Sequence, residues 1–139
     1  GYIGGDTTGG SIASSVAETK LGEVIVAANS ANTRMVIIAG IRFNMGVLST
    51  SANSEFRIRT GTSATATSNT QRGNTVTLNQ NAGTASDTGT GTDGGVIMAT
   101  ITTSDETFTG QIYVHVTGKN SVSNVSIISY CDFIFVLGI

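Results

Sequence analysis

The chain has 139 residues, which is enough for one domain whose hydrophobic core needs no metal or disulfide to hold it. Charged residues make up 12% of the sequence and the net charge is −2 without a basic run, which excludes the electrostatic surface of a nucleic-acid-binding protein. The hydrophobic content of 39% excludes a disordered chain, and the abundance of uncharged polar residues indicates an all-β protein.

Residues 1–15 predict a glycine-rich arm ahead of the folded domain. Large side chains are scarce here, and Tyr2, Ile3 and Ile12 are the candidate anchors of the arm. The segment has neither the basic region nor the apolar region of a signal peptide. We therefore expect two parts, an arm over residues 1–15 and a β-sandwich domain over residues 16–139.

Three strands are expected in the first half of this domain. Residues 22–28 form the first, a turn follows at 29–32, and residues 33–45 form a long second strand with a bulge or bend at Gly40. Residues 54–60 alternate between apolar and polar, which predicts a third strand with one face in the core. Its two faces would carry Phe56 and Ile58 on one side and Glu55, Arg57 and Arg59 on the other.

Two long polar segments separate the strands of the second half. Residues 61–74 and 81–95 lack apolar anchors and predict loops, whereas residues 74–80, 96–103 and 108–117 predict strands. A tight turn is expected at 118–121. In the strand 108–117 one face would carry Phe108, Ile112, Val114 and Val116, and the other Gln111, Tyr113, His115 and Thr117.

The closing stretch, residues 126–139, is the most apolar part of the chain. From Phe133 to Leu137 the residues do not alternate, which predicts that both faces of this strand are dry. Phe133, Phe135 and Leu137 would face one way and Ile134 and Val136 the other, so that one set fills the core and the other lies in an interface. The residues expected to contact a partner subunit are Tyr130, Ile134, Val136 and Ile139.

These elements predict an all-β fold: a single-domain antiparallel β-sandwich of about eight strands with little or no helix. No window has the 3.6-residue apolar period of a helix, and the strands are short and separated by turn residues. Long connections between strands favour a jelly roll. An immunoglobulin-like sandwich is disfavoured because the chain has no tryptophan and no cysteine pair.

Two short strings match catalytic or cofactor-binding signatures without the structural context that such sites need. Asp87-Thr88-Gly89 matches the aspartic-protease signature, but no apolar strand precedes it to bury and align the carboxylate. Gly89, Gly91 and Gly94 have the spacing of a dinucleotide-binding loop, but no helix is expected to follow. We therefore expect no catalytic site, no cofactor and no metal.

The remaining polar residues that could form a functional site are expected to have structural roles instead. Asp105 and Glu106 are expected in a turn, and the single histidine, His115, belongs to no histidine cluster that could bind a metal. The lone Cys131 can form no disulfide within the chain and is expected to be buried. The arginines predict ion pairs between strands or subunits. A glycosylation sequon at Asn124 has meaning only for a secreted chain in a glycosylating host.

In composition and layout the chain resembles small β-sandwich virion proteins, notably the capsid decoration (cement) and head-fibre proteins of tailed phages. The shared features are the glycine-rich arm at 1–15, the polar loops at 61–74 and 81–95, and the apolar terminal strand. The resemblance implies a non-enzymatic jelly-roll subunit, commonly a homotrimer, that binds the major capsid protein or another virion shell. Its place would be the virion surface, with no nucleic-acid partner.

Physical reasoning also favours assembly, because a closed oligomer would bury the second face of the closing strand. The alternative is an extracellular filament or pilus subunit assembled by strand addition, with residues 1–28 as the candidate donor strand. A less favoured alternative is a carbohydrate-binding receptor or fibre module, for which Tyr2, Tyr113 and Tyr130 are the available stacking aromatics. No apolar stretch has the length of a membrane-spanning helix, so we expect no membrane partner.

Overall fold

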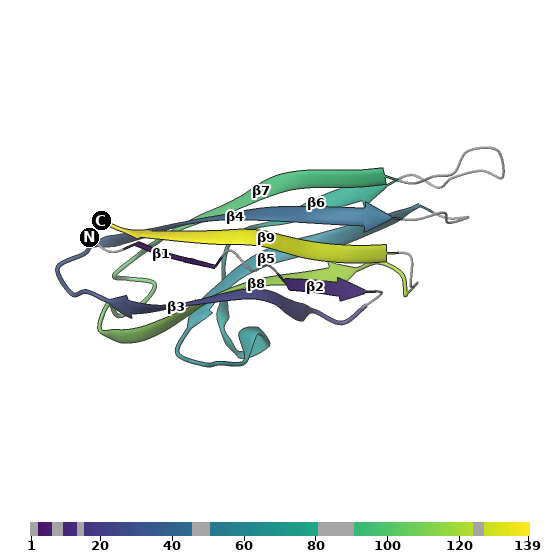
Figure 1. The fold of residues 1–139 in the computed structure, drawn as a ribbon. Coiled ribbons are helices and arrows are strands. Elements are labelled where there is room, and N and C mark those ends of the chain that lie inside the picture. Colours follow the sequence, from purple (N-terminus) through teal and green to yellow (C-terminus); the bar gives the residue numbers. More distant parts are fainter. Residues whose placement is uncertain (1–2, 7–9, 14–15, 46–50, 81–90, 124–126) are drawn as a thin grey trace, which may run out of the picture.

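Two antiparallel sheets packed face to face make up the protein (Figure 1). The computed structural model of the chain describes residues 3–6, 10–13, 16–45, 51–80, 91–123 and 127–139. The strands are β1 (Ile3–Asp6), β2 (Gly10–Ala13), β3 (Thr19–Ala28), β4 (Arg34–Met45), β5 (Ala52–Gly61), β6 (Thr70–Gln80), β7 (Gly91–Thr102), β8 (Gly110–Asn120) and β9 (Ile127–Gly138). The helical part of the described residues is one 3₁₀ turn, η1 (Ala66–Ser68). The expected all-β sandwich with little helix is confirmed.

The strand order is that of a jelly roll. Sheet A has the order β1, β9, β4, β7, with β2 also pairing with β9, and sheet B has the order β3, β8, β5, β6. When β1 and β2 are counted as one edge position, strands that are consecutive in the chain lie in opposite sheets, except β5 and β6. The chain thus wraps around the core in the way that defines a jelly roll.

The core lies between the sheets and follows from the alternation of side chains along each strand. In β4 every second residue from Met35 to Phe43 is buried. In β5 Phe56 and Ile58 are buried, while the charged residues that alternate with them face outward. In β8 the buried apolar residues are Ile112, Val114 and Val116, as the alternation predicts. Cys131 of β9 is also buried, as expected for a lone cysteine.

A bulge in β9 changes the phase of this alternation. Gly40 of β4 pairs with Phe133 and the next residue, Ile41, pairs with Cys131, so Asp132 has no counterpart on β4. The residues on either side of the bulge, Cys131 and Ile134, both point into the core. The irregularity expected at Gly40 is therefore present, and the extra residue belongs to the partner strand.

Several boundaries differ from those expected. The loop expected at 61–74 is shorter because β6 already begins at Thr70, and β7 begins at Gly91 inside the second expected loop. The prediction of a turn at 118–121 is wrong for residues 118–120, because β8 continues to Asn120. Pairing across the sheet kept these polar residues extended although their sequence lacks strand propensity. The N-terminal segment expected to form an arm contributes β1 and β2 to the edge of sheet A.

Candidate functional site

The outer face of sheet A carries a continuous apolar surface. The strand register aligns Met98, Ile38 and Phe135 across β7, β4 and β9 in one row. The row on one side places Val36 between Thr100 and Leu137, and the row on the other places Gly40 between Val96 and Phe133. We call this surface the apolar face, and its members are Val36, Ile38, Val96, Met98, Phe133, Phe135 and Leu137.

Several members of the apolar face are left largely uncovered. Val96 is 55% exposed, Met98 57%, Phe133 41% and Phe135 39%. More than half of the large hydrophobic residues that are exposed in the described part of the chain are these four. Single exposed apolar residues are common, but a contiguous patch of this kind usually marks a surface that another molecule covers.

Gly40 allows the central aromatic ring to lie flat on the sheet. A β-carbon at this position would overlap the ring carbons of Phe133, so the ring occupies the space that a side chain on β4 would take. The β9 bulge places Phe133 opposite this glycine. The two features together place the ring of Phe133 over Gly40 of β4.

A polar cluster borders the apolar face. The Arg42 guanidinium donates hydrogen bonds to both carboxylate oxygens of Asp132, at 3.0 to 3.3 Å, and lies 3.9 Å from the centre of the Tyr130 ring. A charge that is paired and stacked in this way needs no partner outside the chain. An apolar centre with a polar border is the usual anatomy of a protein–protein interface, and Phe, Tyr, Met and Arg are the residue types enriched there.

The outer face of sheet B is polar and satisfied by its own contacts. Glu18 accepts hydrogen bonds from Arg59 at 2.6 and 2.8 Å and from Thr117 at 2.6 Å. The Arg59 guanidinium holds the pKa of the Glu18 carboxyl below its usual value, against the opposing effect of burial. Arg57 pairs with Glu55 within β5 at 2.8 Å, and at the edge of the sheet Arg72 of β6 pairs with Glu106 of the turn after β7 at 2.9 Å. The expected ion pair between strands is present on sheet A, where Arg42 of β4 pairs with Asp132 of β9 at 3.0 Å.

His115 lies in this polar face and is fully buried under the loop that follows β5. The side chain of Asn69 is oriented by Ser63, whose N–H donates to Oδ1 and whose carbonyl accepts from Nδ2. The same Nδ2 lies 3.2 Å from His115 Nδ1, which must therefore be an acceptor, and His115 Nε2–H donates to Glu23 at 2.7 Å. The ring is neutral, because burial lowers the pKa of His115 and the Glu23 carboxylate offsets only part of this effect.

The structure separates the four residues expected at a subunit interface. Ile134 and Val136 are 1% and 0% exposed and belong to the core, so they cannot contact a partner and this expectation is corrected. Tyr130 is half-buried beside the apolar face, and Ile139 is exposed at the end of β9, where its backbone pairs with Arg34. The outward positions belong to Phe133, Phe135 and Leu137, the other set of the same strand.

The other residues singled out in the sequence have structural places. Ile3 of β1 pairs with Leu137 and Ile12 of β2 with Ser129, while Tyr2, the 87–89 string and the sequon at 124–126 lie outside the described residues. Gly91 and Gly94 lie within β7, which is not the loop that a dinucleotide site needs. Asp105 accepts a hydrogen bond from the Thr102 N–H at 2.8 Å, the expected turn contact.

No group of His, Cys, Asp or Glu side chains in the described ranges has an arrangement that could hold a metal ion. None of the helical segments within those ranges is long and apolar enough to cross a membrane.

Sequence comparison finds no matching family model and no matching curated protein. Solved structures share the fold. The C-terminal domain of EclA, a sugar-binding protein, has a TM-score of 0.51 at 8% identity, over 93% of this chain and 78% of that one. The insecticidal delta-endotoxin Cry8Ea1 of Bacillus thuringiensis has a TM-score of 0.52 at 13% identity, over 93% of this chain and 19% of its own.

A chain of the infectious bursal disease virus Gx strain has a TM-score of 0.51 at 16% identity, over 97% of this chain and 31% of the viral chain. This protein therefore spans less than a third of the endotoxin and the viral chain. At such identities the similarity shows a shared β-sandwich fold.

Proposed function

We propose that the protein is a non-enzymatic structural subunit that assembles with copies of itself through the apolar face of sheet A. The carrying observation is the three rows of outward side chains on β4, β7 and β9, which have no charge between Arg34 at one end and Arg42 at the other. Burial of such a face stabilises an oligomer by about 25 cal/mol for each Å² of apolar surface removed from water. The resemblance to phage cement proteins leads us to expect that this closed oligomer is a homotrimer.

We further propose that this oligomer is a capsid decoration or cement protein at the virion surface, with the major capsid protein or another shell component as its partner. The support is the jelly-roll order of the strands, a fold also present in a chain of infectious bursal disease virus. The polar outer face of sheet B would then lie toward solvent. Its charged residues Glu18, Glu55, Arg57 and Arg59 already form ion pairs within the chain.

The alternative of a filament built by strand addition is less well supported. In such a filament, a segment from the next subunit would complete the sheet beside β9. Here β1 and β2 of the same chain pair with β9 along residues 128–131 and 134–137. This pairing favours a closed assembly over an open one.

The proposal is tested by measuring the mass of the protein in solution. We expect a trimer by sedimentation equilibrium at micromolar concentration, and a folded monomer after Phe135→Asp, because a charge in the apolar face cannot be buried without a partner. The matched control is Ile25→Asp, which places the same charge at an exposed apolar position on the outer face of sheet B and should leave the trimer intact. A monomeric wild type, or equal dissociation by both variants, would contradict the proposal.

A further inference from the structure

Residues 62–69 join β5 to β6, and this β5–β6 loop is fastened over His115 through the side chain of Asn69. Asn69 Oδ1 accepts a hydrogen bond from the Ser63 N–H at 3.2 Å. Asn69 Nδ2 donates to the Ser63 carbonyl at 2.8 Å and lies 3.2 Å from His115 Nδ1. Gly61 gives the amide its space, because a β-carbon there would overlap Asn69 Oδ1. One side chain thus connects the loop to a titratable ring.

The backbone of Ser63 fixes the orientation of the Asn69 amide. A backbone N–H can only donate and a carbonyl can only accept, so the amide oxygen must face the first and the amide nitrogen the second. The second hydrogen of the nitrogen then points at His115 Nδ1, and the ring carries its own hydrogen on Nε2, which donates to Glu23 at 2.7 Å. A further proton can therefore enter the ring only at Nδ1, the atom that faces Asn69.

A proton on His115 Nδ1 is incompatible with the closed loop. In the present orientation of Asn69, the new ring N–H would point at the amide NH₂ group, so that two donors face each other. Turning the amide over would bring Oδ1 to the ring, but it would set the nitrogen against the Ser63 N–H and the oxygen against the Ser63 carbonyl. Buried groups without a suitable partner are costly, and movement of the loop would let water accept from Nδ1.

The other contacts of His115 hold the ring in place on the opposite side. Glu23 Oε2 accepts from His115 Nε2 and also from Lys20 Nζ at 3.0 Å, so its negative charge is shared between two donors. Arg59 lies opposite His115 in the strand register and pairs with a carboxylate of its own. The attraction to Glu23 keeps the ring on β8, so the effect of the proton falls on Asn69. The charged and titratable groups around the ring are Glu23, Lys20, Arg59, Glu18 and Tyr113.

We propose that the β5–β6 loop is a pH-sensitive cover, closed over neutral His115 and released when the ring is protonated in mild acid. On release, Asn69 leaves the ring while His115 keeps its hydrogen bond to Glu23. The Asn69 carbonyl accepts from Arg59 Nη1 at 2.9 Å in the closed loop, so opening also frees this donor. The outer face of sheet B would then expose an imidazolium ring beside a guanidinium group. The cover lies on the sheet opposite the apolar face, so this inference is independent of the proposed assembly.

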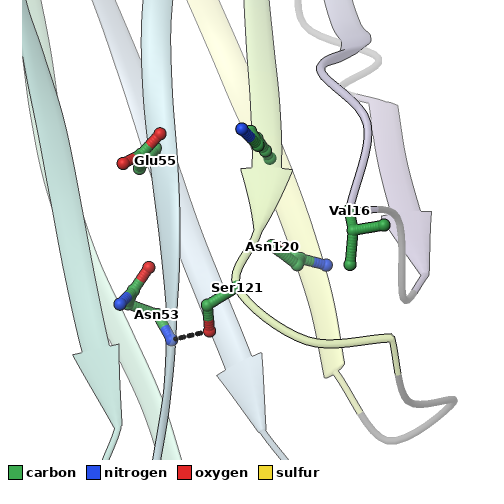
Figure 2. A pocket seen from close by; sticks show the side chains of 6 residues that line it. Val16, Asn53, Glu55, Asn120 and Ser121 are labelled. Atoms are coloured by element: carbon green, nitrogen blue, oxygen red, sulfur yellow. Dashed lines mark hydrogen bonds between the residues drawn. The ribbon is translucent and has the colours of Figure 1, made fainter.

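The test is amide hydrogen exchange of the full chain at pH 7.5 and 5.5, with the rates corrected for the intrinsic effect of pH. In the open loop His115 would titrate near its ordinary pKa of about 6.5, so protonation increases the open population up to about tenfold over this range. The protection of the Ser63 and Asn69 amides should fall by that factor. Ser121 is the control, because its N–H donates to the Asn53 carbonyl and its Oγ accepts from the Asn53 N–H (Figure 2), and neither contact involves a titratable group.

Two variants assign the effect to the contact between Asn69 and His115. His115→Gln removes the titration, so the loop should have the same protection at both pH values. Asn69→Asp should reverse the effect, because a carboxylate accepts both from the Ser63 N–H and from the Nδ1–H of a protonated ring. Its loop should be better protected at pH 5.5 than at pH 7.5. If one variant fails to fold, the other decides the question.

Four results would overturn the proposal. The first is loop protection that does not change with pH in the wild type. The second is loop protection as high as that of β9 at both pH values, since the loop would then open only when the whole domain unfolds. The third is an equal fall at Ser121. The fourth is a fall in acid that persists in His115→Gln or in Asn69→Asp.

Discussion

The two outer faces of the sandwich differ in how their side chains are satisfied. On sheet B, Arg57 and Arg59 of β5 pair with Glu55 and Glu18, and Asn69 of the loop after β5 covers His115. On sheet A, the central rows have no charge and leave two aromatic rings and a methionine about half exposed. Both sheets bury apolar side chains on their inner faces, so the contrast concerns the faces turned away from the core. This difference is the basis of the proposed assembly, because most charged side chains of sheet B find partners within the chain whereas the apolar face of sheet A stays exposed.

The same contrast exists within the single strand β9. Its inner residues are sealed in the core, while Phe133 and Phe135 on the opposite side are 41% and 39% exposed. Assembly would make the two sides equivalent, since both would be removed from water. In the monomer the two sides differ in exposure, and substitutions on each side should therefore change the free energy of unfolding by different amounts.

The largest expected effect is that of Ile134→Ala compared with Phe133→Ala, both in the monomeric Phe135→Asp background so that folding is not coupled to assembly. Ile134 is buried, and its truncation should lower the free energy of unfolding by about 2–5 kcal/mol because it leaves a cavity. Phe133→Ala should lower it by less, because part of the ring is already in water. Urea denaturation measures both values. Equal losses would mean that Phe133 belongs to the monomer core and would remove the basis of the comparison.

Much of this architecture follows from the sequence. The alternation of Phe56 and Ile58 with charged residues identified both faces of β5, and the uninterrupted apolar run at 133–137 identified a strand with apolar side chains on both faces. What the run could not show is which set of side chains faces inward. Periodicity gives the alternation of a strand but not its absolute phase, since a shift of one residue exchanges the two faces.

The bulge at Asp132 is the physical reason that Ile134 and Val136, which were expected at an interface, lie in the core. Continuing the alternation from Tyr130 through a regular strand would place Ile134 and Val136 on the outer side together with Tyr130. The extra residue reverses the phase, so Ile134 and Val136 turn inward. A single charged residue inside an apolar run was a signal of this bulge.

A smaller effect is expected from Gly40→Ala, which sharpens the role of Phe133 in the apolar face. The new β-carbon would overlap the Phe133 ring and displace it, with a cost of about 1–3 kcal/mol and a weaker oligomer. Adding Phe133→Ala removes the overlap. The double variant should then be at least as stable as Phe133→Ala alone, because alanine at this position limits the freedom of the unfolded chain.

The wild type, the two single variants and the double variant form a complete thermodynamic cycle, and urea denaturation measures the free energy of unfolding of each. Additive losses would contradict the proposed contact between the ring and Gly40. Gly94→Ala is a suitable control, since a β-carbon at Gly94 would meet only one backbone atom at an ordinary distance of 3.8 Å.

The smallest expected effect concerns pH and the self-completed face of sheet B. His115 is neutral in the folded protein and its pKa lies below the ordinary value of about 6.5, because burial disfavours the charged ring. The unfolded chain therefore binds more protons in mild acid, and the free energy of unfolding should fall as the pH drops below about 6.5. Glu23 is the carboxylate that faces the ring and limits this loss, while Lys20 on β3 adds to it by repulsion. Arg59, at the paired position of β5, is itself paired with Glu18.

The measurement is urea denaturation between pH 7.5 and 5.5, a window above the range in which the paired carboxylates take up protons. His115→Gln should remove the pH-dependent loss while lowering stability at neutral pH, since the buried contacts with Glu23 and Asn69 are no longer ideal. Phe135→Asp, on the opposite face, should leave the slope unchanged. A slope that persists in His115→Gln would assign the titration to another group and would show that the outer face of sheet B is not completed around a neutral histidine.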